Sequence, residues 1–175
     1  MLDCIKELGE QLPQADRLTV VTQRVGFAIW QIQELENVAV TYFVLAAQAT
    51  KGMGLAAGTA LEDKAKKKTF GATIHRMVEA GLLTLALEER FRKLLSERNW
   101  LVHRSRATSR SAIHRQSGMK RLVARIDAMS DEALELIRDV GELAESYVKM
   151  HGVSEQYITE TAERLLAQWH AEDGI

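Results

Sequence analysis

Apolar residues recur at intervals of three and four along most of the chain, which is the spacing of helices that bury one face. The longest such run predicts a helix over residues 18–50, and its apolar positions include Phe27, Trp30, Leu35, Val38, Tyr42 and Leu45. The same periodicity predicts further helices over 69–80, 85–103, 120–129, 131–150 and 154–170, and a short helical lead-in over 1–15 that is broken near Pro13.

Boundary signals separate these segments. The glycines in Lys51-Gly52-Met53-Gly54 and in His151-Gly152 are typical of helix ends, where the backbone needs positive φ. Ser130, followed by two acidic residues, and Ser154 predict helix N-caps. Thr59-Ala60-Leu61-Glu62 fits a capping box that opens a short turn. The Ser-, Thr- and Arg-rich residues 104–118 predict a loop or a frayed helix.

These elements predict an all-α fold, a helical bundle of about five main helices without a sheet. Good helix formers are frequent, Pro13 is the only proline, and little alternation of the kind typical of strands is present. We expect the 18–50 and 131–150 helices to lie antiparallel, with the 85–103 helix packed between them. A chain of 175 residues with no internal boundary signal suits one helical domain over 1–175.

The cellular setting follows from cysteine usage and hydropathy. Cys4 is the only cysteine, so no intramolecular disulfide can form, which fits a reducing compartment. The longest apolar run, residues 38–49, is shorter than the roughly 20 residues that cross a bilayer. The N-terminus is acidic and has no apolar segment of the signal-peptide kind. We expect a soluble, cytoplasmic protein with no membrane partner.

Charge is distributed unevenly, although the formal net charge is only −1. Residues 98–125 contain no Asp or Glu and carry a charge of +8, so the rest of the chain carries −9. The cations of this basic segment are Arg98, Arg104, Arg106, Arg110, Arg115, Lys120, Arg121 and Arg125. Such a run is often a solvated helix face paired with acidic neighbours, but a run without any acid also favours an anionic partner such as RNA.

The candidate chemistry lies where the basic segment begins, at Arg98, Asn99 and His103. On an ideal helix, Arg98 and His103 lie about 140° apart and flank a groove, whereas Asn99 and His103 share a face, so the amide could orient the imidazole. A guanidinium can clamp a phosphate, and an imidazole can exchange a proton with a ribose hydroxyl near neutral pH. RNA carries its own nucleophile, the 2′-hydroxyl, so this chemistry requires no metal or other cofactor.

The segment Arg98-Asn99-Trp100-Leu101-Val102-His103-Arg104 resembles the Arg-x4-6-His signature of the HEPN superfamily of helical proteins, many of which are ribonucleases. A general helical likeness extends over about residues 20–150, with 154–170 as an added C-terminal helix. The resemblance implies a metal-independent endoribonuclease that works as a homodimer, a toxin or defence effector with an antitoxin or regulatory protein as partner. It implies catalytic roles for Arg98, Asn99 and His103 and backbone binding by Arg104. Because residues 104–118 contain no Phe, Tyr or Trp for base stacking, Arg106 and Arg110 would help Arg104 to bind RNA.

Other readings of the sequence remain open. His75 and Glu79 are four residues apart, but no second ligand pair at helical spacing follows, so we expect no metal site. Trp30, Trp100 and Trp169 are expected as core or interface anchors. The alternative function is a non-catalytic dimerisation or binding module that acts through a partner protein. In the enzyme, Arg98 and His103 of two chains should meet in an open positive cleft, whereas in the module both would be packed or paired with acids.

Overall fold

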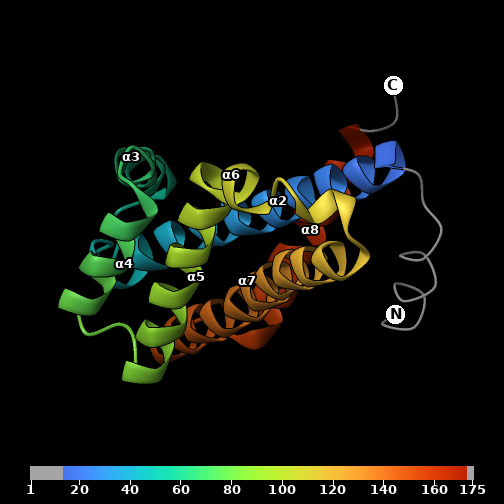
Figure 1. Cartoon of the computed structure of the whole chain (residues 1–175). Coiled ribbons are helices and arrows are strands. Elements are labelled where there is room, and N and C mark those ends of the chain that lie inside the picture. The colour runs from blue at the N-terminus through green and yellow to red at the C-terminus, as the bar shows by residue number, and fades with distance from the viewer. Residues whose placement is uncertain (1–13, 173–175) are drawn as a thin grey trace.

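The computed structural model describes residues 14–172, and this part of the chain is helical apart from short connections and contains no strand (Figure 1). The all-α prediction is therefore confirmed for the described residues. The α-helices are α2 (Gln14–Ala47), α3 (Leu55–Lys66), α4 (Phe70–Glu79), α5 (Leu85–His103), α6 (Ser105–Ser109), α7 (Gln116–Met150) and α8 (Glu155–Glu172), and a 3₁₀ turn, η1, covers Ala112–His114. The lead-in predicted over 1–15 lies mostly outside the described residues.

The two longest helices, α2 and α7, lie side by side along most of their length and run in the same direction (Figure 1). Near one end of the pair, Arg24 of α2 and Asp127 of α7 form an ion pair of 3.2 Å. Near the other end, burial and then the neighbouring Tyr147 of α7 raise the pKa of Tyr42. The antiparallel arrangement predicted for these segments is therefore wrong. The helices α3 to α6 lead the chain back to the end where α2 begins, so α7 starts there and runs parallel to α2. Helices α2 and α7 contact each other directly, so α5 packs against the pair and not between its members.

The core forms where the apolar faces of α2, α4, α5 and α7 meet. Phe70 and Phe91 pack edge to face, with 6.1 Å between their ring centroids. Burying a side chain of this size stabilises a fold by about 1.5–3 kcal/mol. The largest fully buried side chains are Phe91, Ile32, Leu35, Met77, Leu94, Ile126, Leu136 and Val140.

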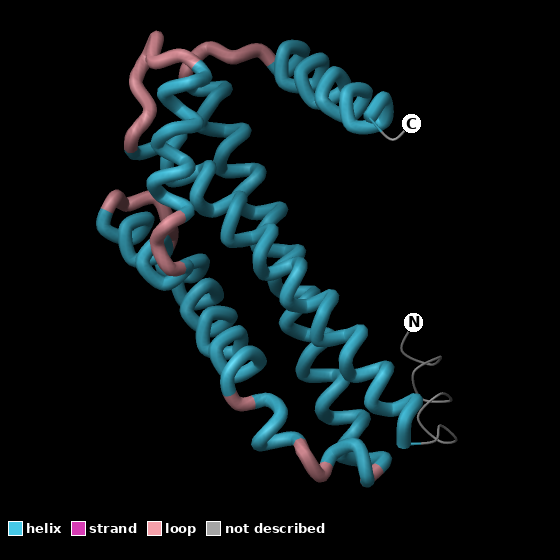
Figure 2. Tube along the Cα trace, turned by 90° about the horizontal axis from the view of Figure 1, so that it is seen from above, coloured by secondary structure: helices cyan, strands magenta, loops and turns pink. Residues whose placement is uncertain are grey.

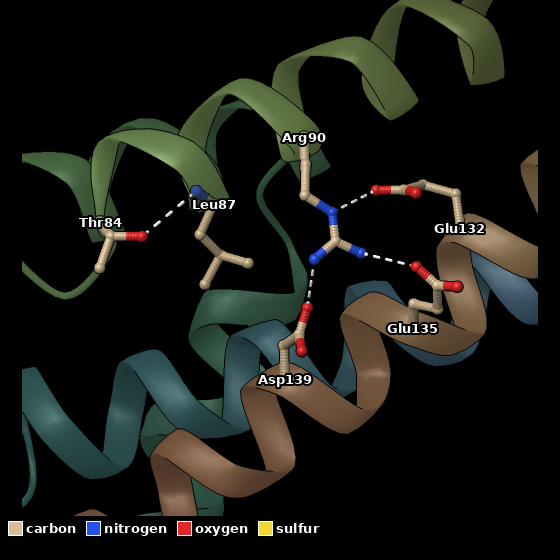
Figure 3. Close-up of polar contacts among 6 residues, drawn as sticks. All are labelled: Thr84, Leu87, Arg90, Glu132, Glu135 and Asp139. Carbon is tan, nitrogen blue, oxygen red and sulfur yellow. Dashed lines mark hydrogen bonds and ion pairs between the residues drawn. The ribbon is translucent and has the colours of Figure 1, made fainter.

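One arginine joins α5 to α7 at the start of α5 (Figure 3). Arg90 donates from Nε to Glu132 at 2.7 Å, from Nη2 to Glu135 at 3.2 Å and from Nη1 to Asp139 at 2.5 Å. The hydrogen bond to Glu132 is the largest cause that raises the pKa of Arg90. Because three carboxylates of one helix converge on a single guanidinium, this contact fixes how α5 lies on α7.

The N-cap predicted at Ser130 is wrong. Residues 116–150 form the single helix α7, and Ser130 is buried in its interior, where its hydroxyl donates to the carbonyl of Ile126 at 3.5 Å. A serine can satisfy its hydroxyl in this way without ending a helix. The local sequence Ser-Asp-Glu fits both situations, and burial of neighbours such as Met129 and Ala133 in the core selects the continuous helix.

The capping box predicted at Thr59 is also wrong. Helix α3 begins after Gly54, and the Thr59 hydroxyl donates to the carbonyl of Leu55 at 3.1 Å inside the helix. The helix N-caps on either side of α4 are Thr69 and Thr84, whose hydroxyls accept from Ala72 N and Leu87 N, each at 3.3 Å.

Residues 104–118, predicted as a loop or frayed helix, are more ordered than expected. They contain α6, η1 and the first turn of α7, and short connections join these elements. The carbonyl of Leu101 accepts from the Ser105 hydroxyl at 2.6 Å, so hydrogen bonding continues across the junction between α5 and α6. Of the arginines in this region, Arg106 lies within α6, whereas Arg104, Arg110 and Arg115 flank the helical elements.

Helix α8 diverges from the α2–α7 pair in the view of Figure 2. Its large apolar side chains Tyr157, Leu165, Leu166 and Trp169 are exposed. Trp30 on α2 is 72% exposed and Trp169 is 64% exposed, so neither is a core anchor of the chain. Among the described residues, no helix combines the length and the apolar character needed to cross a membrane.

Candidate functional site

Helix α5 carries the predicted motif on its last turns. Thr84 caps its beginning, and Phe91, Leu94 and Leu101 anchor its inner face in the core. The helix ends at His103, because the next residue, Arg104, leaves the helical region with φ of −130°. Arg98, Asn99 and His103 thus stand on a rigid element, and the α5 boundaries agree with those predicted from the sequence.

Arg98 is tied to α2 by a residue that the motif does not contain. Its Nη2 lies 3.5 Å from Oε1 of Glu36, and both side chains are about one-third exposed. The Arg98 Nη1 also donates to Oδ1 of Asn99 at 3.4 Å. Burial raises the pKa of Glu36, and the positive charge of Arg98 acts in the opposite direction. The carboxyl group of Glu36 and the guanidinium of Arg98 therefore share the partly buried contact between α2 and α5.

His103 is in a different environment. Its side chain is exposed, and the described residues give it no hydrogen bond or ion pair. The described residues show no hydrogen bond between Asn99 and His103, and the Asn99 amide oxygen accepts from Arg98. The motif thus presents a free imidazole beside an arginine that is held in place, and a single chain brings no other group to the imidazole.

Trp100, between these residues, links α5 to the basic segment. The guanidinium carbon of Arg125 lies 3.5 Å from the centroid of the Trp100 ring, a cation–π contact. The same guanidinium makes paired hydrogen bonds to Glu97, at 2.7 Å and 3.0 Å. The Trp100 Nε1 donates to Thr108 Oγ1 at 3.0 Å, so the ring also holds α6 against α5. Of the three tryptophans, Trp100 alone acts as an anchor within the chain.

The arginines of the basic segment divide into two groups. Arg98 and Arg125 are engaged with Glu36 and Glu97. The remaining arginines have no ion pair within the part of the chain that the structure describes: Arg104, Arg106, Arg110, Arg115 and Arg121. All five are exposed. Uncompensated cations on α6, on the flanking turns and on the first part of α7 attract an anion more strongly than paired ones.

No cluster of three or more His, Cys, Asp or Glu side chains that could hold a metal ion is present among residues 14–172. His75 and Glu79 form an exposed pair of 3.4 Å on α4 and stand alone. Cys4 lies outside the described residues. Arg98 and His103 line neither the cavity between α2, α6, η1 and α7 nor the smaller one beside Trp100 and Arg125.

The roles of two residues in this region could not be predicted from the sequence. Glu36 follows an ordinary helical pattern and gains its significance only from the position of Arg98. Arg17 lies outside the basic segment, yet its Nη1 donates to the carbonyl of Ile113 at 3.4 Å, which ties α2 to η1. Neither residue has a signal in the local sequence, because each contact joins residues far apart in the chain.

Comparisons of this chain with protein-family models, with curated proteins and with solved structures found no match.

Proposed function

We propose that this protein is a metal-independent endoribonuclease of the HEPN type. The observation that carries the proposal is the exposed, unpaired His103 at the end of the helix that holds Arg98, next to the arginines without acidic partners. In the proposed step, the ribose 2′-oxygen attacks phosphorus and the bond to the 5′-oxygen breaks. One imidazole removes the 2′ proton and another protonates the leaving oxygen, which yields a 2′,3′-cyclic phosphate and a 5′-hydroxyl end.

Each residue has a distinct role in this proposal. His103 transfers the protons, and Arg98 stabilises the charge that builds up on the phosphoryl oxygens. Asn99 orients Arg98, to which it is already hydrogen-bonded. Arg104, Arg106 and Arg110 bind the RNA backbone, which should make binding strongly dependent on salt.

The proposal requires two copies of the chain, because one chain offers one motif imidazole while the step needs a base and an acid. We therefore propose a homodimer in which the 98–103 segments of two chains face each other. Light scattering at micromolar concentration should give twice the mass of the chain. A toxin of this kind would be held by an antitoxin or regulatory protein, and a defence effector would be released by a trigger.

The alternative is a non-catalytic binding module, and the ion pair between Arg98 and Glu36 favours it. A guanidinium that is already paired with an acid from its own chain has less charge to offer a phosphate. The exposed His103 favours the enzyme, because packing against the rest of the chain does not account for an imidazole without a partner.

The deciding experiment compares the His103→Ala protein with a matched His170→Ala control. His170 is an exposed histidine on α8, far along the chain from the motif. Both proteins and the unmodified chain are incubated with labelled single-stranded RNA in the presence of EDTA. We expect cleavage with cyclic phosphate ends by the unmodified chain and the control, and a loss of about 10²–10⁴-fold with His103→Ala. Cleavage that His103→Ala retains, or that EDTA abolishes, overturns the proposal.

A further inference from the structure

A cavity of about 490 Å³ opens between α2, α6, η1 and α7, away from the 98–103 motif. Its walls are mostly apolar and include Leu18, Val21 and Val25 from α2, and Leu122 and Ile126 from α7. This size is in the range of sites that hold small organic ligands, about 300–1,000 Å³. An apolar wall without convergent amides or carboxylates is poorly suited to a sugar or a free nucleotide.

The rim of the cavity is cationic. Arg106 of α6, Arg110 directly after α6 and His114 of η1 line it, together with the hydroxyl-bearing Ser109. Within the described part of the chain, neither arginine has an acidic partner. The rim can therefore offer two guanidinium groups and one imidazole to an anion.

The side chain of Arg17 adds a further positive charge next to the residues that line the cavity. Arg17 of α2 donates from Nη1 to the carbonyl of Ile113, which itself lines the cavity. The Arg17 Nε is buried, and the described residues offer it no hydrogen-bond acceptor. Arg17 does not line the cavity itself, so it adds positive charge near the site and no direct contact with a ligand there.

We propose that this cavity binds a small amphipathic acid, with an apolar chain or ring against Val21, Val25 and Ile126 and a carboxylate at Arg106 and Arg110. The proposal goes beyond RNA cleavage, since the cavity lies apart from Arg98 and His103. The two arginines also belong to the proposed RNA-binding set, so a bound acid would compete with RNA for them.

The test measures binding to the full-length chain by calorimetry, without RNA, so that its outcome does not depend on the proposed ribonuclease activity. Octanoate is compared with 1-octanol, which has the same apolar chain and no charge. Octanoate should bind at one saturable site, and 1-octanol about tenfold more weakly or less, because a charge-assisted pair of hydrogen bonds is lost.

Octanoate binding by substituted proteins tests whether the acid binds in this cavity. The double change Arg106→Gln and Arg110→Gln should reduce octanoate affinity to that of 1-octanol. The control Arg138→Gln, an exposed arginine of α7 outside the cavity, should leave it unchanged. Val21→Phe should weaken both ligands by filling the cavity, with circular dichroism confirming that the variant is folded.

Three results would overturn the proposal. The first is the absence of saturable octanoate binding, and the second is equal affinity for octanoate and 1-octanol. The third is octanoate binding only after residues 2–12 have been deleted, which would assign the cavity in the full chain to its own N-terminal segment.

Discussion

Arg98 of α5 reaches across to Glu36 of α2, with 3.5 Å between Nη2 and Oε1. The contact is an ion pair without a hydrogen bond, because the Glu36 Oε1 is buried and accepts none from the described residues. Two helices therefore determine where the motif arginine points. In the proposed enzyme, Glu36 would position Arg98 and restrain it until a phosphate competes for the guanidinium.

If Arg98 stabilises developing charge, replacing it should lower the rate of RNA cleavage. We expect Arg98→Ala to reduce the rate by about 10²–10³-fold, the usual cost of losing one donor aimed at the transition state. Arg92→Ala is the matched control, since Arg92 is an exposed arginine of the same helix whose partner is Glu88. Initial rates on the same labelled RNA measure both effects. Equal rates for the two variants would remove Arg98 from the mechanism.

The partly buried Glu36 should make stability depend on pH. Burial raises the pKa of Glu36, so the folded chain holds this proton more tightly than the unfolded chain does. Its contribution to stability therefore falls as pH rises from the ordinary glutamate pKa through the raised value. The Glu36→Gln variant lacks this titration, so its melting temperature should rise relative to the unmodified chain as the pH increases above the ordinary glutamate pKa of 4.5.

The control for this pH series is Glu89→Gln, a change at an exposed glutamate of α5. Thermal melts at each pH should give a constant difference between this control and the unmodified chain. A difference for Glu36→Gln that also stays constant with pH would show that Glu36 is not desolvated in the folded chain.

The contact of Arg90 with three carboxylates predicts a larger stability effect than a single surface pair. Arg90→Ala leaves Glu132, Glu135 and Asp139 facing one another on α7 without their shared cation. Because the group is partly exposed, we expect a loss of about 1–2 kcal/mol in the free energy of unfolding.

Urea unfolding at low and high salt tests this prediction. The loss caused by Arg90→Ala should shrink in high salt, which screens both the attraction and the repulsion. Arg92→Ala, which removes one i,i+4 pair, should cost only about 0.3–0.5 kcal/mol. An Arg90→Ala loss no greater than this would mean that the three-carboxylate cluster contributes nothing beyond an ordinary pair.

Replacing each of two glycines of α7 by alanine should change the stability of the protein in opposite directions. A Cβ at Gly141 would meet no atom within 4 Å, so Gly141→Ala should stabilise the helix by roughly 0.5–1 kcal/mol. A Cβ at Gly118 would lie 3.0 Å from Cα and 3.2 Å from the carbonyl oxygen of Ala112, so η1 would have to move. We expect thermal melts to show a higher midpoint for Gly141→Ala and a lower one for Gly118→Ala. A Gly118→Ala midpoint as high as that of Gly141→Ala would contradict close packing of η1 on α7.

The sequence by itself determined the helical character of the chain and several helix ends. Periodicity placed a helix over 85–103, and α5 has these bounds. Positive φ at Gly52 and Gly152 agrees with the breaks predicted there. These features depend on interactions within a few residues, namely the backbone hydrogen bonds of a helix, the spacing of its apolar face and the freedom of glycine at its end. The concentration of positive charge in residues 98–125 is likewise a property of the sequence alone.

Only the tertiary structure determined which contacts the residues in these local features make. Ser130 matches an N-cap in sequence, but core packing on both sides keeps α7 continuous through it. Asn99 was expected to orient His103, yet it accepts a hydrogen bond from Arg98, whose position depends on Glu36. The cavity with its cationic rim exists because α6 and η1 cross over α2 and α7. Each outcome depends on contacts between residues that are distant in sequence. The packing of whole helices determines which of these residues meet, and no local pattern does so.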